Sequence, residues 1–214
     1  MNAHACAIDP ENLLESGSTA VAPAAQQLAA EAHEAFLRED VRRVRACLGA
    51  ALELSPGNGE LALALGHAEM SAGNLEAALA AYWNATLISP HLASAHSNHA
   101  LVLQLLGRQE EASRDALRAL SLDPTDLVAL KVLARIHLNA GQHEAAQQAC
   151  RLILEQDEQD SEARQMFEEA IIQEAKLGEI LPQKPEGRQL PAAAAPPRIV
   201  PPLVKPPKNT ARTF

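Results

Sequence analysis

Histidines are the residues of this chain whose type and spacing best suit metal chemistry. His91, His96 and His99 lie within one short segment, and a three-residue spacing puts His96 and His99 on one face of a helix. Two imidazoles so arranged can ligate a metal ion. The alternative is that they are packed, hydrogen-bonded histidines, because the repeat pattern of the chain assigns both to core-facing positions. We favour that alternative, and we predict no metal site and no cofactor.

The three cysteines, Cys6, Cys47 and Cys150, are an odd number and have no zinc-like spacing. Cys47 and Cys150 fall three repeats apart, which is too far for a disulfide in an extended array. We expect free thiols in a reducing cytoplasm, two of which pack between helices. A redox or metal-binding role is the alternative.

No motif in the sequence indicates an enzyme. The chain has no glycine-rich phosphate loop, no GxSxG elbow and no HExxH pair. We therefore predict that the protein is not an enzyme and that its function resides on a surface. The helices that form such a surface are predicted from a repeat in the sequence.

Prolines and glycines recur along the chain at an interval of 34 residues. The repeating residues are Pro56, Pro90 and Pro124, and Gly73, Gly107 and Gly141. Glycine accepts the positive φ that ends a helix, and proline prevents a helix from continuing. Each unit is therefore predicted to be a helix, a tight turn, a second helix and a stop.

Small residues recur at the same interval, which indicates closely packed helices with an aliphatic core. These alanines are Ala51, Ala85 and Ala119 at one position and Ala78, Ala112 and Ala146 at another. The second unit, with Leu65, Gly66, Ala78, Tyr82, Ala85 and Pro90, resembles a tetratricopeptide repeat. The resemblance implies an all-α fold, a right-handed helical solenoid of four helix-turn-helix repeats with a C-terminal capping helix.

This resemblance divides the chain into an array and two flanking segments. The first and fourth repeats depart from the pattern, since Glu39 replaces glycine, Val44 replaces alanine and Glu158 replaces proline. Terminal repeats are commonly atypical. The predicted division is a disordered N-terminal segment 1–24, repeats 25–58, 59–92, 93–126 and 127–160, a capping helix 161–181, and a proline-rich, basic, disordered tail 182–214.

Charge is unevenly distributed. The net charge is −9, but the segment from 182 onward has six basic residues and one acid, so residues 1–181 carry −14. Acids crowd the junction before the last helix, from Glu155 to Glu162. They serve either to start that helix, with Asp160 or Ser161 as its N-cap, or to dock a basic partner or the chain's own tail. Arg38, Arg42, Arg43 and Arg45 crowd the first repeat, which leaves self-assembly into a homo-oligomer open.

The cellular compartment of the protein and the class of its partners are predicted from features that the sequence lacks. No stretch has the ~20 apolar residues that a bilayer span needs, and the N-terminus does not resemble a secretory signal. We predict a cytoplasmic protein without membrane insertion and without a nucleic-acid partner. The tail is interpreted as a flexible linker, with a proline-binding partner or an electrostatic tether as alternatives.

The resemblance also implies a binding surface, because the first helices of successive repeats line a concave groove that holds an extended peptide or a helix. By this register the groove is apolar at its N-terminal end, polar in the middle and basic at Lys131 and Arg135, which can attract an acidic group. The alternative is that these are ordinary solvated side chains. The predicted groove residues are His33, Phe36, Leu37, His67, Met70, Asn98, Leu101, Gln104, Lys131, Arg135 and Leu138.

The clamp with which co-chaperone members of the family hold terminal carboxylates is not reproduced. Of its positions, occupied here by Leu63, His67, Asn98, Val128 and Val132, only Asn98 matches. We therefore predict a scaffold or adaptor that binds another protein with modest affinity, since aromatic anchors are scarce. Two alternatives are a targeting or accessory module of a glycosyltransferase, secretion or pilus-assembly system, and a self-assembling scaffold.

Overall fold

A computed structural model describes residues 23–180 of the chain, and this part is entirely helical. The segments predicted to be disordered, 1–24 and 182–214, lie outside the described residues except for Pro23 and Ala24, which begin the first helix. The helices are α2 (Pro23–Leu37), α3 (Val41–Leu54), α4 (Gly59–Ser71), α5 (Leu75–Ile88), α6 (Ala93–Leu105), α7 (Gln109–Leu122), α8 (Leu127–Asn139), α9 (His143–Gln156) and α10 (Ser161–Ile180).

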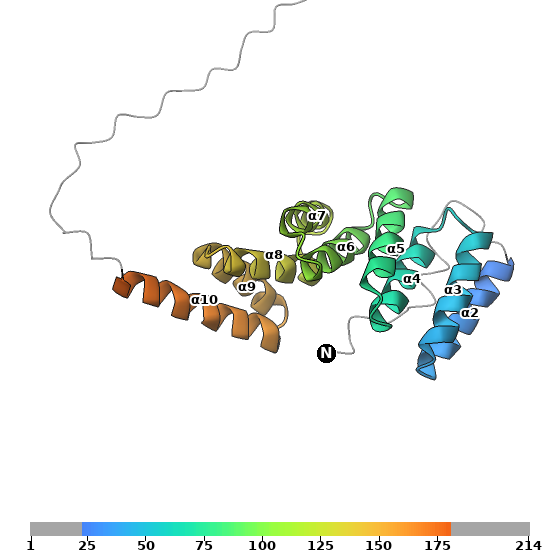
Figure 1. Cartoon of the computed structure of the whole chain (residues 1–214), viewed down its shortest axis with the longest axis horizontal. Coiled ribbons are helices and arrows are strands. Elements are labelled where there is room, and N and C mark those ends of the chain that lie inside the picture. Colours follow the sequence, from blue (N-terminus) through green and yellow to red (C-terminus); the bar gives the residue numbers. More distant parts are fainter. Residues whose placement is uncertain (1–22, 181–214) are drawn as a thin grey trace, which may run out of the picture. The chain divides into compact units, whose positions relative to one another are not determined.

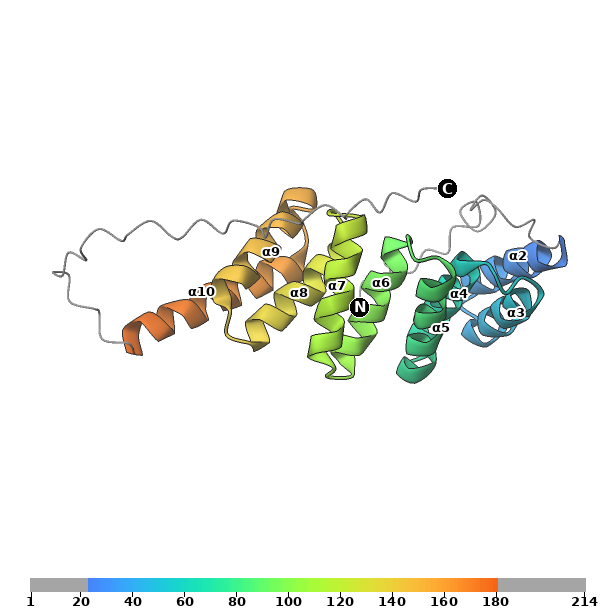
Figure 2. The ribbon, with the colours of Figure 1, turned by 90° about the horizontal axis from the view of Figure 1, so that it is seen from above.

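Helices that are consecutive in the chain are neighbours in space (Figure 1). α2 pairs with α3, α4 with α5, α6 with α7 and α8 with α9, and the second helix of each pair packs on the first helix of the next (Figure 2). α6 packs also on α8, and α10 packs on α8 and α9. The all-α solenoid predicted from the 34-residue interval is confirmed.

The turn inside each repeat has the predicted left-handed residue. Gly73, Gly107 and Gly141 have φ of 78°, 80° and 71°. In the second repeat the N–H of Asn74 donates to the carbonyl of Glu69 (2.9 Å), which closes the end of α4. Glu39 takes the same conformation, with φ of 59°, although it has a side chain. The first turn is therefore strained where the other three are relaxed.

Asn and Asp side chains cap the start of four of the described helices. Asp40 accepts the N–H of Arg43 (3.1 Å) and Asn58 accepts the N–H of Leu61 (3.2 Å). Asp126 accepts the N–H of Ala129 (2.9 Å), and Asp160 accepts the N–H of Ala163 (2.9 Å). Each bond satisfies a donor that the first helical turn leaves free. The prediction that Asp160 or Ser161 caps the last helix is confirmed for Asp160.

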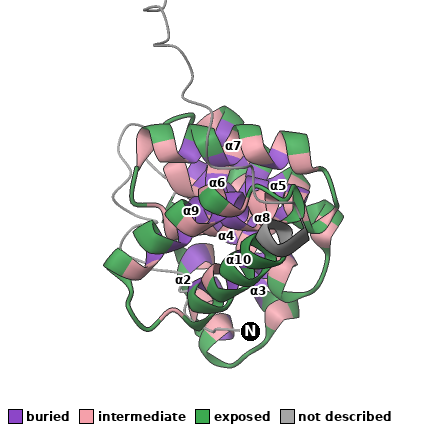
Figure 3. Cartoon of the chain, turned by 90° about the vertical axis from the view of Figure 1, so that its left-hand side faces the viewer, coloured by how far each residue is buried: buried purple, intermediate pink, exposed green. Residues whose placement is uncertain are grey.

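The core consists of the repeating alanines and of aliphatic side chains between the helix layers, seen as the purple interior in Figure 3. All six alanines of the two repeating positions are fully buried. At Gly66 a Cβ would lie 2.4 Å from the ring of Tyr82, the largest fully buried side chain of the described residues. Small residues here set how closely two helices can approach.

Helix α10 is the last helix of the described residues, and its outer face is polar where the earlier first helices are small and apolar. One position of the repeat has a small, buried residue in each earlier first helix, namely Ala32, Gly66, Ala100 and Ala134. In α10 the same position has Glu168, which is exposed. The inner face of α10 buries Ala163, Met166 and Ala170. Ile171 is 45% exposed, because no second helix covers it within the described residues.

None of the helices within residues 23–180 combines the length and the apolar character that crossing a bilayer requires.

Candidate protein-binding groove

One face of each first helix stays accessible after packing, and these faces form the candidate groove. On α4 the partly or fully exposed residues Glu60, His67, Met70 and Ser71 recur at spacings of seven and three or four, which is one face of a helix. Leu65 is also partly exposed but packs on the opposite side, against the core between α2 and α3. The accessible face is thus a narrow stripe.

All the residues predicted for the groove lie on α2, α4, α6 and α8, and none of them is buried. Other positions of the same register are buried, including Leu63, Ser97 and Val132, because neighbouring helices cover them. The register from the sequence therefore places these side chains on the accessible face, but it overestimates how wide that face is.

The N-terminal end of this surface has a cavity of about 350 Å³. Its lining is mostly apolar and comes from three helices and one turn, namely Phe36, Leu37, Glu39, Val41, Val44, His67, Ala68 and Ser71. Leu37 is 69% exposed and stands at the rim. The cavity joins three predicted groove residues, Phe36, Leu37 and His67, into one site.

Sequence register did not identify Val41 and Val44 as lining residues. They belong to α3, a second helix, and the register assigned only first helices to the groove. One signal was present in the sequence: Glu39, at a position that otherwise holds glycine, marks the turn beside the cavity. Strained non-glycine residues are found more often than usual near binding sites.

His67 is a neutral polar group in this apolar surrounding. Burial lowers the pKa of His67 to about 4, although a hydrogen bond with the Asn98 side chain acts in the opposite direction. The ring lies edge-on to Tyr82, with centroids 5.5 Å apart. Its buried Nε2 has no hydrogen-bond partner among the described residues. Near pH 7 the imidazole brings no charge to the groove.

The middle of the groove is polar, and one of its polar groups is already hydrogen-bonded within the protein. The Asn98 amide donates to the carbonyl of Ser94 (2.7 Å), so one of its donors is used within α6. Leu101 and Gln104 are partly exposed and Leu105 is 54% exposed. Leu105 occupies the same repeat position as Leu37. This equivalence indicates from the sequence that Leu105 lies on the accessible face.

At the C-terminal end the two cations of the groove are already paired. The Lys131 ammonium lies 2.6 Å from Asp160 and 3.5 Å from Glu162, and the Arg135 guanidinium lies 3.6 Å from Glu162 and 3.9 Å from Glu169. The acids belong to α10 and to the residue that caps it.

The pKa shifts agree with these contacts. Burial by itself would lower the pKa of Lys131, but the hydrogen bond and charge of Asp160 outweigh it and raise the pKa. Burial by itself would raise the pKa of Asp160, but the hydrogen bond and charge of Lys131 and the backbone N–H groups of Ala163 and Glu162 together lower it. That this end attracts an acidic group of a ligand stays a prediction, and in the array with α10 in place such a group would have to compete with Asp160, Glu162 and Glu169 for the two cations.

Glu60 differs from these acids. It is partly buried in the first turn of α4, and its carboxylate has no ion pair and no hydrogen bond with any described residue. Burial raises the pKa of Glu60. It is an unpaired acid on the accessible stripe of α4.

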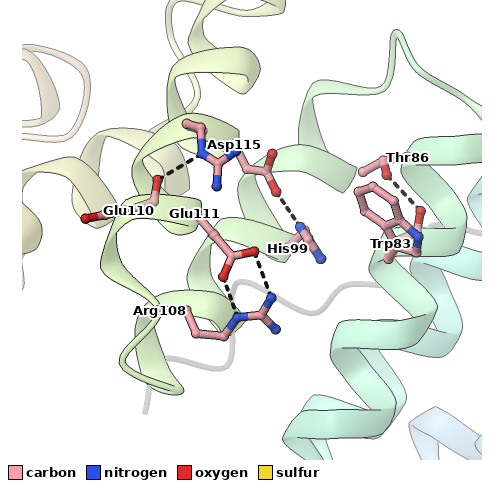
Figure 4. Close-up of polar contacts among 8 residues, drawn as sticks. Trp83, Thr86, His99, Arg108, Glu110, Glu111 and Asp115 are labelled. Carbon is pink, nitrogen blue, oxygen red and sulfur yellow. Dashed lines mark hydrogen bonds and ion pairs between the residues drawn. The ribbon is translucent and has the colours of Figure 1, made fainter.

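The histidines considered as metal ligands are engaged in separate contacts. His99 is 7% exposed, its Nδ1 is hydrogen-bonded to Asp115, and its ring lies 5.5 Å from that of Trp83 (Figure 4). The Nε2 of His96 contacts the carbonyl of Pro90 (3.2 Å). Within residues 23–180 no group of three or more histidine, cysteine or acidic side chains is placed to hold a metal.

The two cysteines within the described residues are buried free thiols. Burial raises the pKa of Cys150 to about 11, so the thiolate that reacts with oxidants or metals is scarce at pH 7. Both cysteines belong to the core of second helices, Cys47 in α3 and Cys150 in α9.

Comparison with known proteins gives a family match and several similar folds. The tetratricopeptide repeat family model matches residues 103–170, from within α6 to within α10. None of the curated proteins matches the chain by sequence.

Three solved structures illustrate the likeness of fold. A tetratricopeptide repeat protein from Parabacteroides merdae ATCC 43184 has a TM-score of 0.64 and 22% identity, over 74% of this chain and 63% of that one. A MamA structure has a TM-score of 0.57 and 17% identity, over 78% and 98%. The first tetratricopeptide unit of Spaghetti (RPAP3), bound to the HSP90 peptide SRMEEVD, has 0.52 and 20%, over 55% and 93%. At these identities the likeness shows the fold.

Proposed function

We propose that this chain, a member of the tetratricopeptide repeat family, is a non-enzymatic scaffold or adaptor that holds a segment of another protein in its groove. The observation that carries the proposal is the apolar cavity beside Phe36, Leu37 and His67, at the N-terminal end of the accessible faces of the first helices. A cavity of about 350 Å³ accommodates one large side chain of a ligand.

The family supports the general class, since tetratricopeptide repeats are as a rule modules for protein interaction. One structural neighbour, the RPAP3 unit, is bound to a peptide. Recognition in this chain must use other contacts than a carboxylate clamp, because four of the five clamp positions lack the required side chain and Leu63 and Val132 are buried.

The lining predicts an extended ligand and modest affinity. Outside the cavity the accessible stripes offer the partly exposed side chains of Met70 and Leu101 as adaptable apolar contacts. Such a surface buries a few ligand side chains and leaves others in water, so most of the binding energy should come from the residue in the cavity.

The test is selection of a random peptide library on the full chain. The recovered peptides are then measured on Leu37→Glu, which puts a charge at the rim of the cavity. Because Leu37 is 69% exposed, this change should leave the fold intact. We expect affinity to fall at least about tenfold, since the ligand must then desolvate a carboxylate.

The matched control is Leu87→Glu on α5, a second helix. Leu87 is 61% exposed and lies outside the groove, so the same change in charge should leave peptide affinity unaltered. Peptides that bind wild type and Leu37→Glu equally well, or that lose affinity only on Leu87→Glu, would contradict the proposal.

Head-to-tail self-assembly, the alternative that the charge pattern left open, is not favoured by the contacts. Three of the four arginines expected to attract a second copy are paired within the array, as Arg38 with Glu34, Arg43 with Glu31 and Arg45 with Glu69. At the acidic end Asp160 and Glu162 are likewise paired, with Lys131 and Arg135, which reduces the charge that a second copy could neutralise.

A further inference from the structure

The accessible stripes of the first helices carry few full charges. At the groove positions of α4, α6 and α8 the charged side chains are Glu60, Lys131 and Arg135. The two cations face the three carboxylates Asp160, Glu162 and Glu169. Two cations against three acids leave that end with an excess of negative charge.

Glu60 adds a second negative charge, and no described residue neutralises it. The start of α4 favours a negative charge, but the loss of water outweighs it, since burial raises the pKa of Glu60 and no cation pairs with it. His67, on the same face of α4, brings no compensating charge either, since its ring is neutral near pH 7. The groove is therefore acidic.

Glu60 and the cavity lie on the same line. Seven residues separate Glu60 from His67, which is close to two helical turns, so both point to the same side of α4 about 10 Å apart along its axis. An extended peptide advances about 3.3 Å per residue and covers that distance in about three residues.

We infer that the groove recognises a segment of a partner protein with one large apolar residue, which enters the cavity between α2, α3 and α4, and a lysine or arginine about three residues away, which pairs with Glu60. This inference rests on the proposed function and specifies its ligand. An acidic segment is disfavoured because it meets like charge at Glu60 and at the carboxylates of α10.

The test begins with the same peptide selection on the full chain. We expect the peptides that depend on Leu37 to be enriched in an apolar residue and a basic residue about three positions apart. For one such peptide, replacing its basic residue with methionine should weaken binding to wild type about five- to tenfold and should weaken binding to Glu60→Gln much less.

The matched control is Glu76→Gln. Glu76 is also an acid in the first turn of a helix, but it lies on α5, outside the groove. Its replacement should leave the preference for a basic residue unchanged. If Glu76→Gln and Glu60→Gln reduce the preference equally, only the overall charge of the protein matters, and the inference is overturned.

A second variant should reverse the preference. Glu162→Gln combined with Glu169→Gln removes the acids that face Arg135, while Asp160 still caps α10 and holds Lys131. We expect selection on this variant to recover acidic peptides that wild type does not bind. Unchanged selection would show that the α10 acids do not set the charge preference and would count against the inference.

The outcomes separate this inference from the proposed function. If no recovered peptide depends on Leu37, the groove function itself fails. If peptides depend on Leu37 but are neutral or acidic, the groove function stands and the basic ligand is excluded. If the chain dimerises in sedimentation and Glu60→Gln abolishes the dimer, the occupant is a second copy, and the inference of a separate partner is overturned.

Discussion

Each end of the groove has a polar side chain at the edge of an apolar core. The two ends stabilise that side chain in opposite ways. His67 of α4 and Arg135 of α8 occupy the same position of their repeats, 68 residues apart. At the N-terminal end burial keeps the imidazole neutral and leaves an open cavity beside it. At the C-terminal end the side chain keeps its charge, and acids of α10 pair with it.

The difference arises from the first helix of the next unit in the array. Beyond α4 and α5 this helix is α6, whose Asn98 offers only an amide to His67. Beyond α8 and α9 it is α10, which has acids at the groove-facing positions Glu162 and Glu169. The N-terminal end is therefore available to a ligand, whereas the C-terminal end is closed by ion pairs inside the protein. Four changes test this contrast, from the largest expected effect to the smallest.

The largest effect concerns His67 and pH. Its pKa is about 4 when folded and about 6.5 when unfolded, so between these values the unfolded chain binds a proton that the folded chain does not. Stability is fully present above about pH 6.5 and falls as pH decreases, by roughly 3 kcal/mol at pH 4. His67→Gln, which cannot titrate, should remove this part of the decline in urea denaturation between pH 7 and 4.5. Parallel curves for wild type and variant would show that the imidazole is not kept neutral.

The second change acts on the other end. Lys131→Met leaves Asp160, whose side chain is 8% exposed, without its cation, and we expect a loss of about 2 kcal/mol at pH 7. The pKa of Asp160 is lowered in the folded protein, so its ion pair stabilises above the unfolded pKa and is lost as pH falls. The difference between variant and wild type should accordingly shrink below about pH 4. Lys131→Arg keeps the charge and is the control. A neutral or stabilising Lys131→Met would mean that the pair does not hold α10.

The third change concerns the strained turn beside the cavity. Glu39→Gly should stabilise the protein by about 1 kcal/mol, because a side chain in the left-handed region costs energy that glycine does not incur. Gly73→Glu makes the reverse change at the equivalent turn, where φ is 78°, and should destabilise by a similar amount. Thermal unfolding of both variants measures the two effects. If both variants stabilise the protein, or both destabilise it, by the same amount, the assignment of strain to Glu39 is contradicted.

The smallest effect comes from the exposed acids of α10. Glu162 and Glu169 are about half exposed, at 52% and 48%, so replacing both with glutamine should cost at most about 0.5 kcal/mol at moderate salt. The cost should fall further in 1 M salt, where such pairs are screened. A loss as large as that of Lys131→Met would show that these pairs, and not Asp160, hold α10 in place.

Much of this architecture can be predicted from residue order alone. The interval of 34 residues predicts the helix pairs, and the buried alanines at its fixed positions confirm the packing. It also places His99 in the core, where it is hydrogen-bonded to Asp115. Such features depend on local conformation and on repetition, and both can be predicted from the order of the residues.

Pairing of charges could not be predicted in the same way. The sequence contains Lys131, Arg135 and the acids near residue 160, but their partners were open to a ligand, the tail or each other. Likewise Val41 and Val44 of α3 became part of the cavity only when α2, α3 and α4 packed together. Contacts of this kind join side chains that no fixed interval relates.

By itself, then, the sequence determined the repeat, the helix ends and the identity of the accessible face, because glycine, proline and alanine act on the few residues around them. Only the tertiary structure decided the charge of that face. The three carboxylates of the α10 end neutralise Lys131 and Arg135 across distances of 2.6 to 3.9 Å, while Glu60 is left without a partner among the described residues. Electrostatic character depends on distances and burial in the folded array, and those exist only once the helices are packed.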